Sequence, residues 1–161
     1  MHIWVSEKWV KKINWANEDY RSGLRIKIDK NVDPEVKRAC KEFAVWLRKE
    51  YFFPIRVPIY VKASLNLKTL DGSKAFGTFF RPDSFKDEPY IRIAAGDYGD
   101  MLNKWGKDSA LAVILKTISH ELTHYFQWIN GLELTLLGEE RQATKYSRYI
   151  LNEYAETRDH P

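Results

Sequence analysis

Two histidines and a glutamate in one short stretch have the residue types and the spacing that bind a catalytic metal ion. His120, Glu121 and His124 form the pattern HExxH in the segment HELTH. Four residues make just over one helical turn, so both imidazoles lie on one face of a helix and can bind the same ion. Glu121 lies about 100° around the helix from His120, where it can act as a general base. The motif therefore predicts metal-dependent hydrolysis with zinc as the metal ion.

The surrounding residues predict the helix that this motif requires. The segment 109–130 contains no proline, and its apolar residues recur at spacings of three and four. Asp108 or Ser109 can cap its start, and Gly131 is placed to end it. The apolar stripe consists of Leu111, Ile114, Leu115, Ile118, Leu122, Tyr125, Phe126 and Ile129. Because both histidines fall on the flank of this stripe, we expect them at the border between the core and a cleft.

The motif leaves open the third protein ligand that a catalytic zinc ion requires. In metzincins a Gly and a third His follow the motif at fixed steps, and here Gln127 and Asn130 occupy those positions. His160 lies in an expected C-terminal tail. A second helix is predicted over 138–159, and Glu140 shares its apolar face, so we expect Glu140 to complete the site. The alternatives are Glu153, Glu139 and Glu156.

The two helices together resemble the glutamate-type zincins. In that group an HExxH helix is completed by a glutamate on the next helix, within the pattern E-x-x-A, and the residues from Glu140 to Ala143 match it. The similarity is greatest to small, minimal zincins of the prophage and mobile-element type, which include repressor-cleaving peptidases. Thr144 stands where an acidic residue often follows the Ala. The resemblance implies one zincin-like metallopeptidase domain over 1–161.

This ligand set implies a zinc-dependent metallopeptidase that acts on a peptide or protein. Zn²⁺ would be held by His120, His124 and Glu140. Glu121 would take a proton from the zinc-bound water and pass it to the departing amine. The donor to the developing oxyanion is not singled out by the sequence. The candidates are Tyr146, Tyr149, Tyr154 and His160.

Composition favours one globular domain. The chain has 161 residues, of which 44% are hydrophobic and 14% aromatic. Its 26 basic and 22 acidic side chains are mixed along the sequence, which does not favour a nucleic-acid partner. No apolar run approaches the roughly 20 residues of a membrane span. Cys40 is the one cysteine, and we expect it buried in a protein of a reducing compartment. We therefore predict a cytoplasmic protein without membrane association.

The first half of the chain alternates predicted strands and a helix. A strand is expected over 24–28, followed by a helix over 34–51 with Asp33 as its N-cap. A second strand is expected within 55–63, where Pro58 favours an edge position or a bulge.

The remaining extended segments suggest a small sheet. The runs 74–80 and 89–95 are expected to form an antiparallel pair, with a turn at Asp71 and Gly72 and a bulge at Gly77. The fold class is therefore α+β and zincin-like. A small, mainly antiparallel sheet packs against an N-terminal helix, the HExxH metal helix and a C-terminal second helix. An edge of this sheet could bind an extended peptide as an added strand.

The alternative is a catalytically silent, zinc-stabilised module that binds a protein or nucleic-acid partner. The chain has six Trp and nine Tyr, and such rings can stack on bases. Four of the tryptophans fall at apolar-face positions and are expected in the core. They are Trp4, Trp9, Trp46 and Trp128. A structural zinc site would close its fourth position with Cys or His, whereas Cys40 lies on a distant element.

Overall fold

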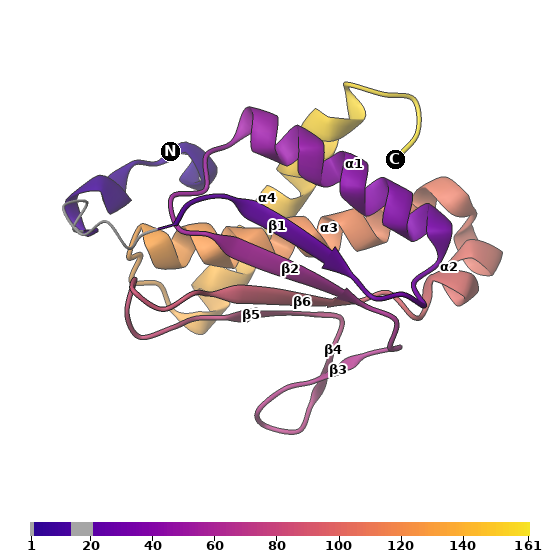
Figure 1. The fold of residues 1–161 in the computed structure, drawn as a ribbon, viewed down its shortest axis with the longest axis horizontal. Helices are drawn as coiled ribbons and strands as arrows, with labels where there is room; N and C mark the ends of the chain where they lie inside the picture. Colours follow the sequence, from indigo (N-terminus) through magenta and orange to yellow (C-terminus); the bar gives the residue numbers. More distant parts are fainter. Residues whose placement is uncertain (1, 14–20) are drawn as a thin grey trace.

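A four-stranded mixed sheet forms the centre of the computed structural model, which describes residues 2–13 and 21–161 (Figure 1). The strand order is β1-β2-β6-β5. β1 (Leu24–Ile28), β2 (Val57–Lys62) and β6 (Tyr90–Ala94) are parallel, and β5 (Gly77–Phe80) pairs with β6 in the antiparallel direction. The predicted antiparallel pair is confirmed, and β5 is one edge of the sheet.

The prediction of a mainly antiparallel sheet is wrong. A helix, α1 (Pro34–Glu50), lies between β1 and β2 in the chain, and such a crossover returns the second strand parallel to the first. The edge position predicted from Pro58 is also wrong, because β2 lies between β1 and β6. Pro58 is tolerated since pairing with β6 begins only at Ile59, so the missing N–H lies ahead of that ladder.

A small hairpin projects from the sheet (Figure 1). It consists of β3 (Leu67–Lys68) and β4 (Lys74–Ala75), joined by a turn in which Gly72 has φ +83°. The turn predicted at Asp71 and Gly72 is therefore confirmed. The predicted run 74–80 divides at Phe76 into β4 and β5.

The predicted helices are present, with one addition. α1 is capped by the Asp33 carboxylate, which accepts from the main-chain N of Glu35 at 2.8 Å. α3 (Lys107–Ile129) carries the HExxH motif, and α4 (Leu136–Ala155) follows it. A short helix, α2 (Tyr98–Trp105), was not predicted. Two 3₁₀ turns, η1 (Ile3–Val5) and η2 (Lys8–Lys11), precede the sheet.

The ends of α3 differ slightly from expectation. Gly106, with φ +86°, is the N-cap instead of Asp108 or Ser109, because the helix begins at Lys107. The predicted stop is confirmed, since Gly131 has the positive φ of +60° that follows many helix ends.

The helices cover one face of the sheet. Figure 1 shows α3 and α4 behind the strands and α1 along the β1 side. Alternate strand residues point into this layer and are fully buried, among them Ile59, Ile91 and Ile93. The helices contribute further fully buried side chains, which include Phe43, Leu47, Leu115, Tyr125 and Tyr154. The opposite face of the sheet carries no helix.

Most of the aromatic residues expected in the core are buried. Trp4, Trp46 and Trp128 are buried, whereas Trp9 is partly exposed. Cys40 is buried as predicted, and burial raises the pKa of its thiol to about 12. In the described part of the chain, none of the helices combines the length and the apolar character that crossing a membrane requires.

Candidate metal centre

The motif segment of α3 is held in place by buried hydrogen bonds. The hydroxyl of Thr123, inside the motif, accepts from Trp4 Nε1 at 3.0 Å and donates to the main-chain O of Ser119. One residue after the motif, the Tyr125 hydroxyl donates to the main-chain O of Ile55 and accepts from its N–H. These contacts join α3 to the N-terminal segment and to the chain entering β2, so the rotation of α3 about its axis is fixed.

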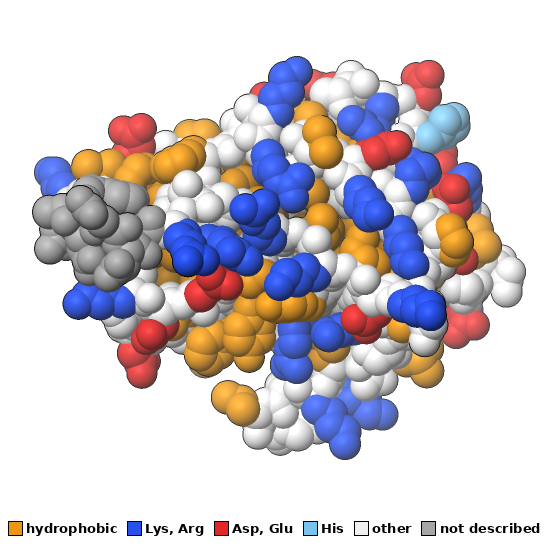
Figure 2. Space-filling view, in the orientation of Figure 1, with side chains coloured by type: hydrophobic (Ala, Val, Ile, Leu, Met, Phe, Trp, Pro, Cys, Tyr) orange, Lys and Arg blue, Asp and Glu red, His pale blue; other side chains and the backbone are white. Residues whose placement is uncertain are grey.

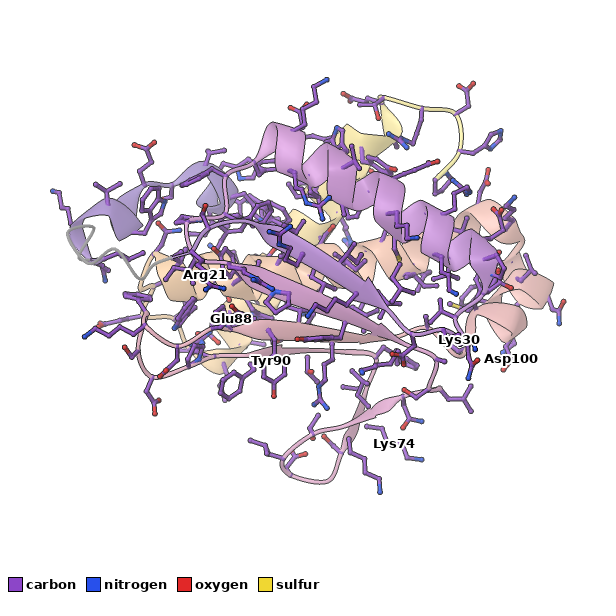
Figure 3. The ribbon with its side chains drawn as sticks, in the orientation of Figure 1. Arg21, Lys30, Lys74, Glu88, Tyr90 and Asp100 are labelled. Atoms are coloured by element: carbon purple, nitrogen blue, oxygen red, sulfur yellow. The ribbon has the colours of Figure 1, made fainter. Side chains whose placement is uncertain are left out.

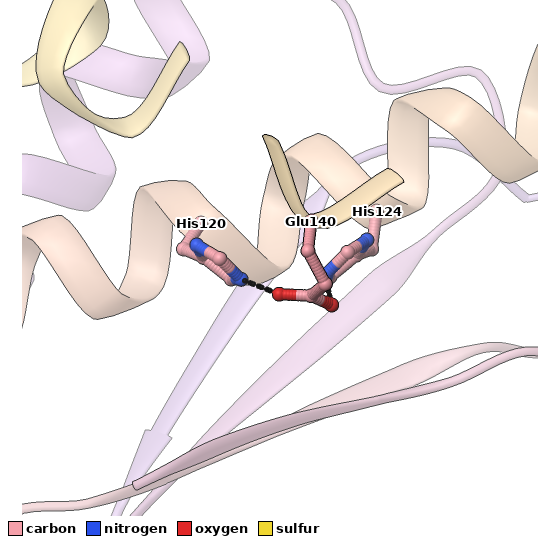
Figure 4. A group of neighbouring side chains, drawn as sticks. All are labelled: His120, His124 and Glu140. Carbon is pink, nitrogen blue, oxygen red and sulfur yellow. Dashed lines mark hydrogen bonds and ion pairs between the residues drawn. The ribbon is translucent and has the colours of Figure 1, made fainter. Parts of the chain in front are cut away.

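The structure brings Glu140 to the two histidines (Figure 4). One carboxylate oxygen of Glu140 lies 3.1 Å from His120 Nε2, and the other lies 3.0 Å from His124 Nε2. Each of the three residues offers one possible ligand atom, and these three atoms lie within 4.8 Å of one another. The group could therefore hold one metal ion. Ligands bonded to a tetrahedral zinc ion at about 2.0–2.1 Å lie about 3.3 Å apart. The observed spacings are close to that value.

Gln127 determines which nitrogen of His124 carries the proton. Its amide Nε2 donates to the main-chain O of Glu139 and to Gln142 Oε1, so its own oxygen faces His124 Nδ1 at 2.8 Å. An amide oxygen only accepts, and Nδ1 must therefore be the donor. Nε2 of the neutral ring then presents a lone pair to the Glu140 carboxylate. Two acceptors 3.0 Å apart require a cation or a second proton between them.

His120 is suited to bind a metal as a neutral ring. Burial lowers the pKa of His120 below its ordinary value, and the neighbouring His124 lowers it further. Glu140 acts in the opposite direction but does not cancel these two effects. A lower pKa keeps a nitrogen lone pair available at neutral pH.

Glu121 lies beside the ligand group but does not belong to it. It is 7% exposed, and burial together with the charge of Glu140 raises the pKa of its carboxyl to about 8. A carboxyl with a raised pKa next to a metal site is a candidate for proton transfer. A bound cation would favour the ionised form and lower this pKa.

The ligand group opens into a cleft of about 430 Å³. One wall is formed by α3 and α4, through His120, Glu121, His124, Glu139 and Glu140. The other wall is formed by every second residue of the β4–β5 segment. These residues are Ala75, Gly77, Phe79 and Arg81.

Gly77 and Arg81 are residues that motif reasoning missed. A Cβ atom on Gly77 would lie 2.8 Å from Thr117 Cγ2 and 2.9 Å from Glu121 Oε1, so a larger residue would force one of these side chains to move. This close approach explains the glycine that was predicted to mark a bulge. Arg81 forms an ion pair with Glu139 at 3.2 Å and lines the cleft. The signal available in the sequence was that Gly77 and Arg81 are an even number of residues apart in an extended segment, so both point to the same side.

The other glutamates lie elsewhere or have other partners. Glu139 lines the cleft, paired with Arg81, but does not join the ligand group. Glu153 is about 20 Å from Glu140 along α4, and it accepts a hydrogen bond from the Tyr51 hydroxyl. Glu156 is the exposed C-cap of α4.

None of the proposed oxyanion donors lines the cleft. Tyr154 is buried against Phe43 and Trp46, and His160 contacts Asp108 at 2.7 Å. Tyr146 and Tyr149 pack against His2. Arg81 is the cationic side chain among the residues that line the cleft.

An apolar pocket of about 320 Å³ adjoins the cleft along α3. Thr117 lines this pocket and is one helical turn before Glu121, which lines the cleft. Phe76 lines the pocket and precedes Gly77 of the cleft wall. The apolar part of the lining includes Met101, Trp105, Val113 and Ile114, and three charged residues, Asp97, Asp100 and Lys104, line it as well.

Comparisons of the chain with protein-family models, with curated proteins and with solved structures find no match in any of the three. The functional argument therefore rests on the geometry of the site.

Proposed function

We propose that this protein is a zinc-dependent metallopeptidase of the glutamate-zincin type. The observation that carries the proposal is the convergence of the Glu140 carboxylate on His120 Nε2 and His124 Nε2, at 3.1 and 3.0 Å. Two imidazole nitrogens and one carboxylate oxygen are a ligand set that zinc accepts, and three protein ligands leave a fourth position open. A structural zinc site closes that position with protein, so the open cleft favours catalysis over the silent binding module.

A zinc ion at this site would supply a Lewis acid that polarises a carbonyl and lowers the pKa of water. The chain's own residues supply the proton transfer and the positioning. The Glu121 carboxylate accepts a proton at the cleft wall and returns it to the departing amine. Arg81 lines the same cleft, where its guanidinium can donate to the carbonyl oxygen as negative charge develops on it.

The free edge of β5 provides a means of holding an extended substrate. Phe76 O accepts from Ala94 N at 2.8 Å, so the main-chain groups of Phe76 and Thr78 point towards β6. By strand alternation, those of Gly77 and Phe79 point to the open edge. A peptide added there as another strand would run along the cleft.

The apolar pocket suggests which residues the substrate carries. Thr117 is about 6 Å from Glu121 along the helix, and an extended peptide advances about 3.3 Å per residue. A substrate side chain within about two positions of the cleaved bond would therefore reach this pocket. Large apolar side chains fit its lining of Met101, Trp105 and Val113.

Zinc content tests the metal site directly. Elemental analysis of the untagged protein, purified without added metal, should give about one zinc per chain. His120→Ala and Glu140→Ala should lose it. Glu153→Gln is the matched control on the same helix and should keep it. A wild-type protein without zinc after loading and dialysis would overturn the proposal.

Cleavage of a randomised peptide library tests the activity and the pocket together. The zinc-loaded protein should select peptides with a large apolar residue within two positions of the cleaved bond. Val113→Asp replaces an apolar side chain of the pocket lining with a charged one and should lower cleavage of those peptides about tenfold, with zinc retained. A zinc-loaded protein that cleaves no library peptide and no protein of a cell extract would refute a peptidase but leave the metal site standing.

A further inference from the structure

The face of the sheet that carries no helix is basic and aromatic. Alternation along each strand places inward residues in the core and their neighbours on this outer face. None of the outward strand residues is acidic. Pro58 and Ala94 share this face but are buried. The other outward residues are Arg25 and Lys27 from β1, Tyr60 and Lys62 from β2, Thr78 and Phe80 from β5, and Tyr90 and Arg92 from β6. We call this set the outer face.

The register of the sheet arranges these side chains in rows. Lys27 is paired with Tyr60, Tyr60 with Arg92, and Arg92 with Thr78. Strands lie about 4.8 Å apart, so this row spans about 14 Å. Neighbouring rows on the same face are about 6.6 Å away. The outer face is therefore long enough to contact several consecutive units of a linear polymer.

Most cations of the outer face have no acidic partner. Lys62 lies 3.7 Å from Asp29. Among the described residues, Arg25, Lys27 and Arg92 form no ion pair with a carboxylate. Figure 2 views this side of the molecule and shows Lys and Arg side chains gathered across its middle, with acidic side chains mostly towards the margins. This face therefore carries several cations close together, although the whole chain carries only +4.

Aromatic rings lie between these cations. The Lys27 and Lys62 ammonium groups lie 5.6 and 5.5 Å from the centre of the Tyr60 ring. The rings of Phe80 and Tyr90 stack on each other, with centres 4.8 Å apart and planes 14° from parallel. Phe80 remains 45% exposed. Flat rings beside cations form the combination that binds a base and its phosphate together.

The hairpin completes a groove along one side of the outer face. This groove has a volume of about 750 Å³ and is lined by Thr78, Phe80, Tyr90 and Arg92 of the outer face. Lys68 of the hairpin lines it as well. Figure 3 shows Tyr90 on the sheet and Lys74 on the hairpin beneath it. Asp71 also lines the groove, and its carboxylate is bound to Thr69 and Ser73 within the turn.

We propose that the outer face binds single-stranded nucleic acid. Arg25, Lys27, Lys62 and Arg92 contact phosphates, and unpaired bases stack on Tyr60 and on the Phe80–Tyr90 pair. An acidic protein would use the cations but would not require exposed ring faces between them. Paired bases in a duplex would not expose their faces to these rings.

The proposed nucleic-acid surface is separate from the metal centre. By strand alternation, Gly77 and Phe79 of β5 are on the cleft side, whereas Thr78 and Phe80 are on the outer face. Phe79 is the one residue that lines both the cleft and the groove. The sheet itself lies between the two sites. Loss of the metal should therefore leave nucleic-acid binding unchanged, and the two proposals can fail independently.

Fluorescence anisotropy with a labelled 15-nucleotide oligothymidylate tests the proposal. Four phosphate contacts on a single strand predict a slope of about −3 for log K against log salt, or roughly a 50-fold loss from 50 to 200 mM. Arg25→Glu with Lys27→Glu should weaken binding at least about tenfold. Lys145→Glu with Arg148→Glu on α4 makes the same charge change on exposed residues and should weaken it less than about twofold.

Ring and competition experiments separate stacking from simple charge attraction. Phe80→Leu keeps an apolar side chain but removes the ring, and should weaken binding about fivefold or more. Thermal melting checks that each variant is folded. The His120→Ala variant should bind like the wild type. The proposal is overturned by absent binding at 50 mM salt, by an equal loss in the α4 control, or by equal competition from duplex DNA or polyglutamate.

Discussion

The two ends of α4 each place a glutamate near a histidine, but the groups around the two carboxylates differ. Near the start of α4, Glu140 faces the Nε2 atoms of His120 and His124. Near its end, Glu153 accepts a hydrogen bond from the Tyr51 hydroxyl and acts electrostatically on His2. Both glutamates were reasonable third ligands from the sequence.

The difference shows that the pattern of donors and acceptors distinguishes a candidate metal site from an ordinary polar contact. Hydroxyl donors satisfy the carboxylate of Glu153 without a metal. At Glu140 the facing atom of His124 is an acceptor, because Gln127 holds the proton on the other nitrogen. Buried Glu121 has no hydrogen-bond donor among the described side chains. A cation at the Glu140 end would stabilise all these acceptors together.

The largest expected effect is that of Glu121→Gln. Glutamine has nearly the same size but cannot accept the proton, so cleavage of a peptide selected from the library should fall about 100- to 10,000-fold. Zinc content should stay near one per chain. Glu153→Gln is the matched change at the other end of α4 and should alter the initial rate less than about twofold. A rate for Glu121→Gln within tenfold of the wild type would refute the assigned role.

Removing the metal should make the buried Glu121 carboxyl destabilising at high pH. The pKa of Glu121 is about 8 in the folded protein, above its ordinary value of 4.5. The folded protein then keeps a proton that the unfolded chain releases, so the free energy of unfolding falls as pH rises from about 4.5 to about 8.

Chemical denaturation in the presence of a chelator measures this effect. At pH 8 the Glu121→Gln variant should be more stable than the wild type by roughly 4 kcal/mol. At pH 4.5 the two proteins should have nearly equal stability. A constant difference between the two proteins at all pH values would show that the Glu121 carboxyl is ionised without the metal.

Gln127→Ala tests whether the acceptor that orients His124 matters for metal binding. Loss of the hydrogen bond to Nδ1 should raise the Kd for zinc about 10- to 100-fold, measured by competition with a chelating dye. Gln142→Ala removes only a partner of Gln127 and should raise the Kd much less. An unchanged Kd in Gln127→Ala would mean that helix packing alone orients His124.

The smallest expected effect is at the other end of α4. Tyr51→Phe removes the hydroxyl that donates to Glu153, and the free energy of unfolding should fall by about 1–2 kcal/mol. Zinc content and cleavage rate should not change. Loss of zinc in this variant would mean that the two ends of α4 are coupled, against the separation that the structure shows.

Local features of the site could be predicted from the sequence. The spacing within HExxH, the apolar stripe around it and the stop at Gly131 are properties of a single helix, so α3 was expected nearly as it is found. The approach of Glu140 was expected from the face that it shares on α4, and its role as a ligand stays a prediction. The Asp33 cap of α1 and the turn at Gly72 are also local.

The direction and order of the strands could not be predicted in the same way. Strand patterns show which residues alternate but not which strands become neighbours, so the parallel sheet and the central position of Pro58 were missed. The same limit hid the role of Gly77. A side chain at this position would meet Thr117 and Glu121, which are about 40 residues later in the chain.

The sequence by itself therefore determined which possible metal ligands share one face of α3, because helical periodicity depends on neighbours a few residues apart. Only the tertiary structure decided what surrounds that chemistry. It brought Arg81 to the cleft, and it placed Arg25, Lys27, Lys62 and Arg92 on one face although the charges are mixed along the chain. The physical reason is that sheet pairing joins residues distant in sequence, and register then decides which of them share a face.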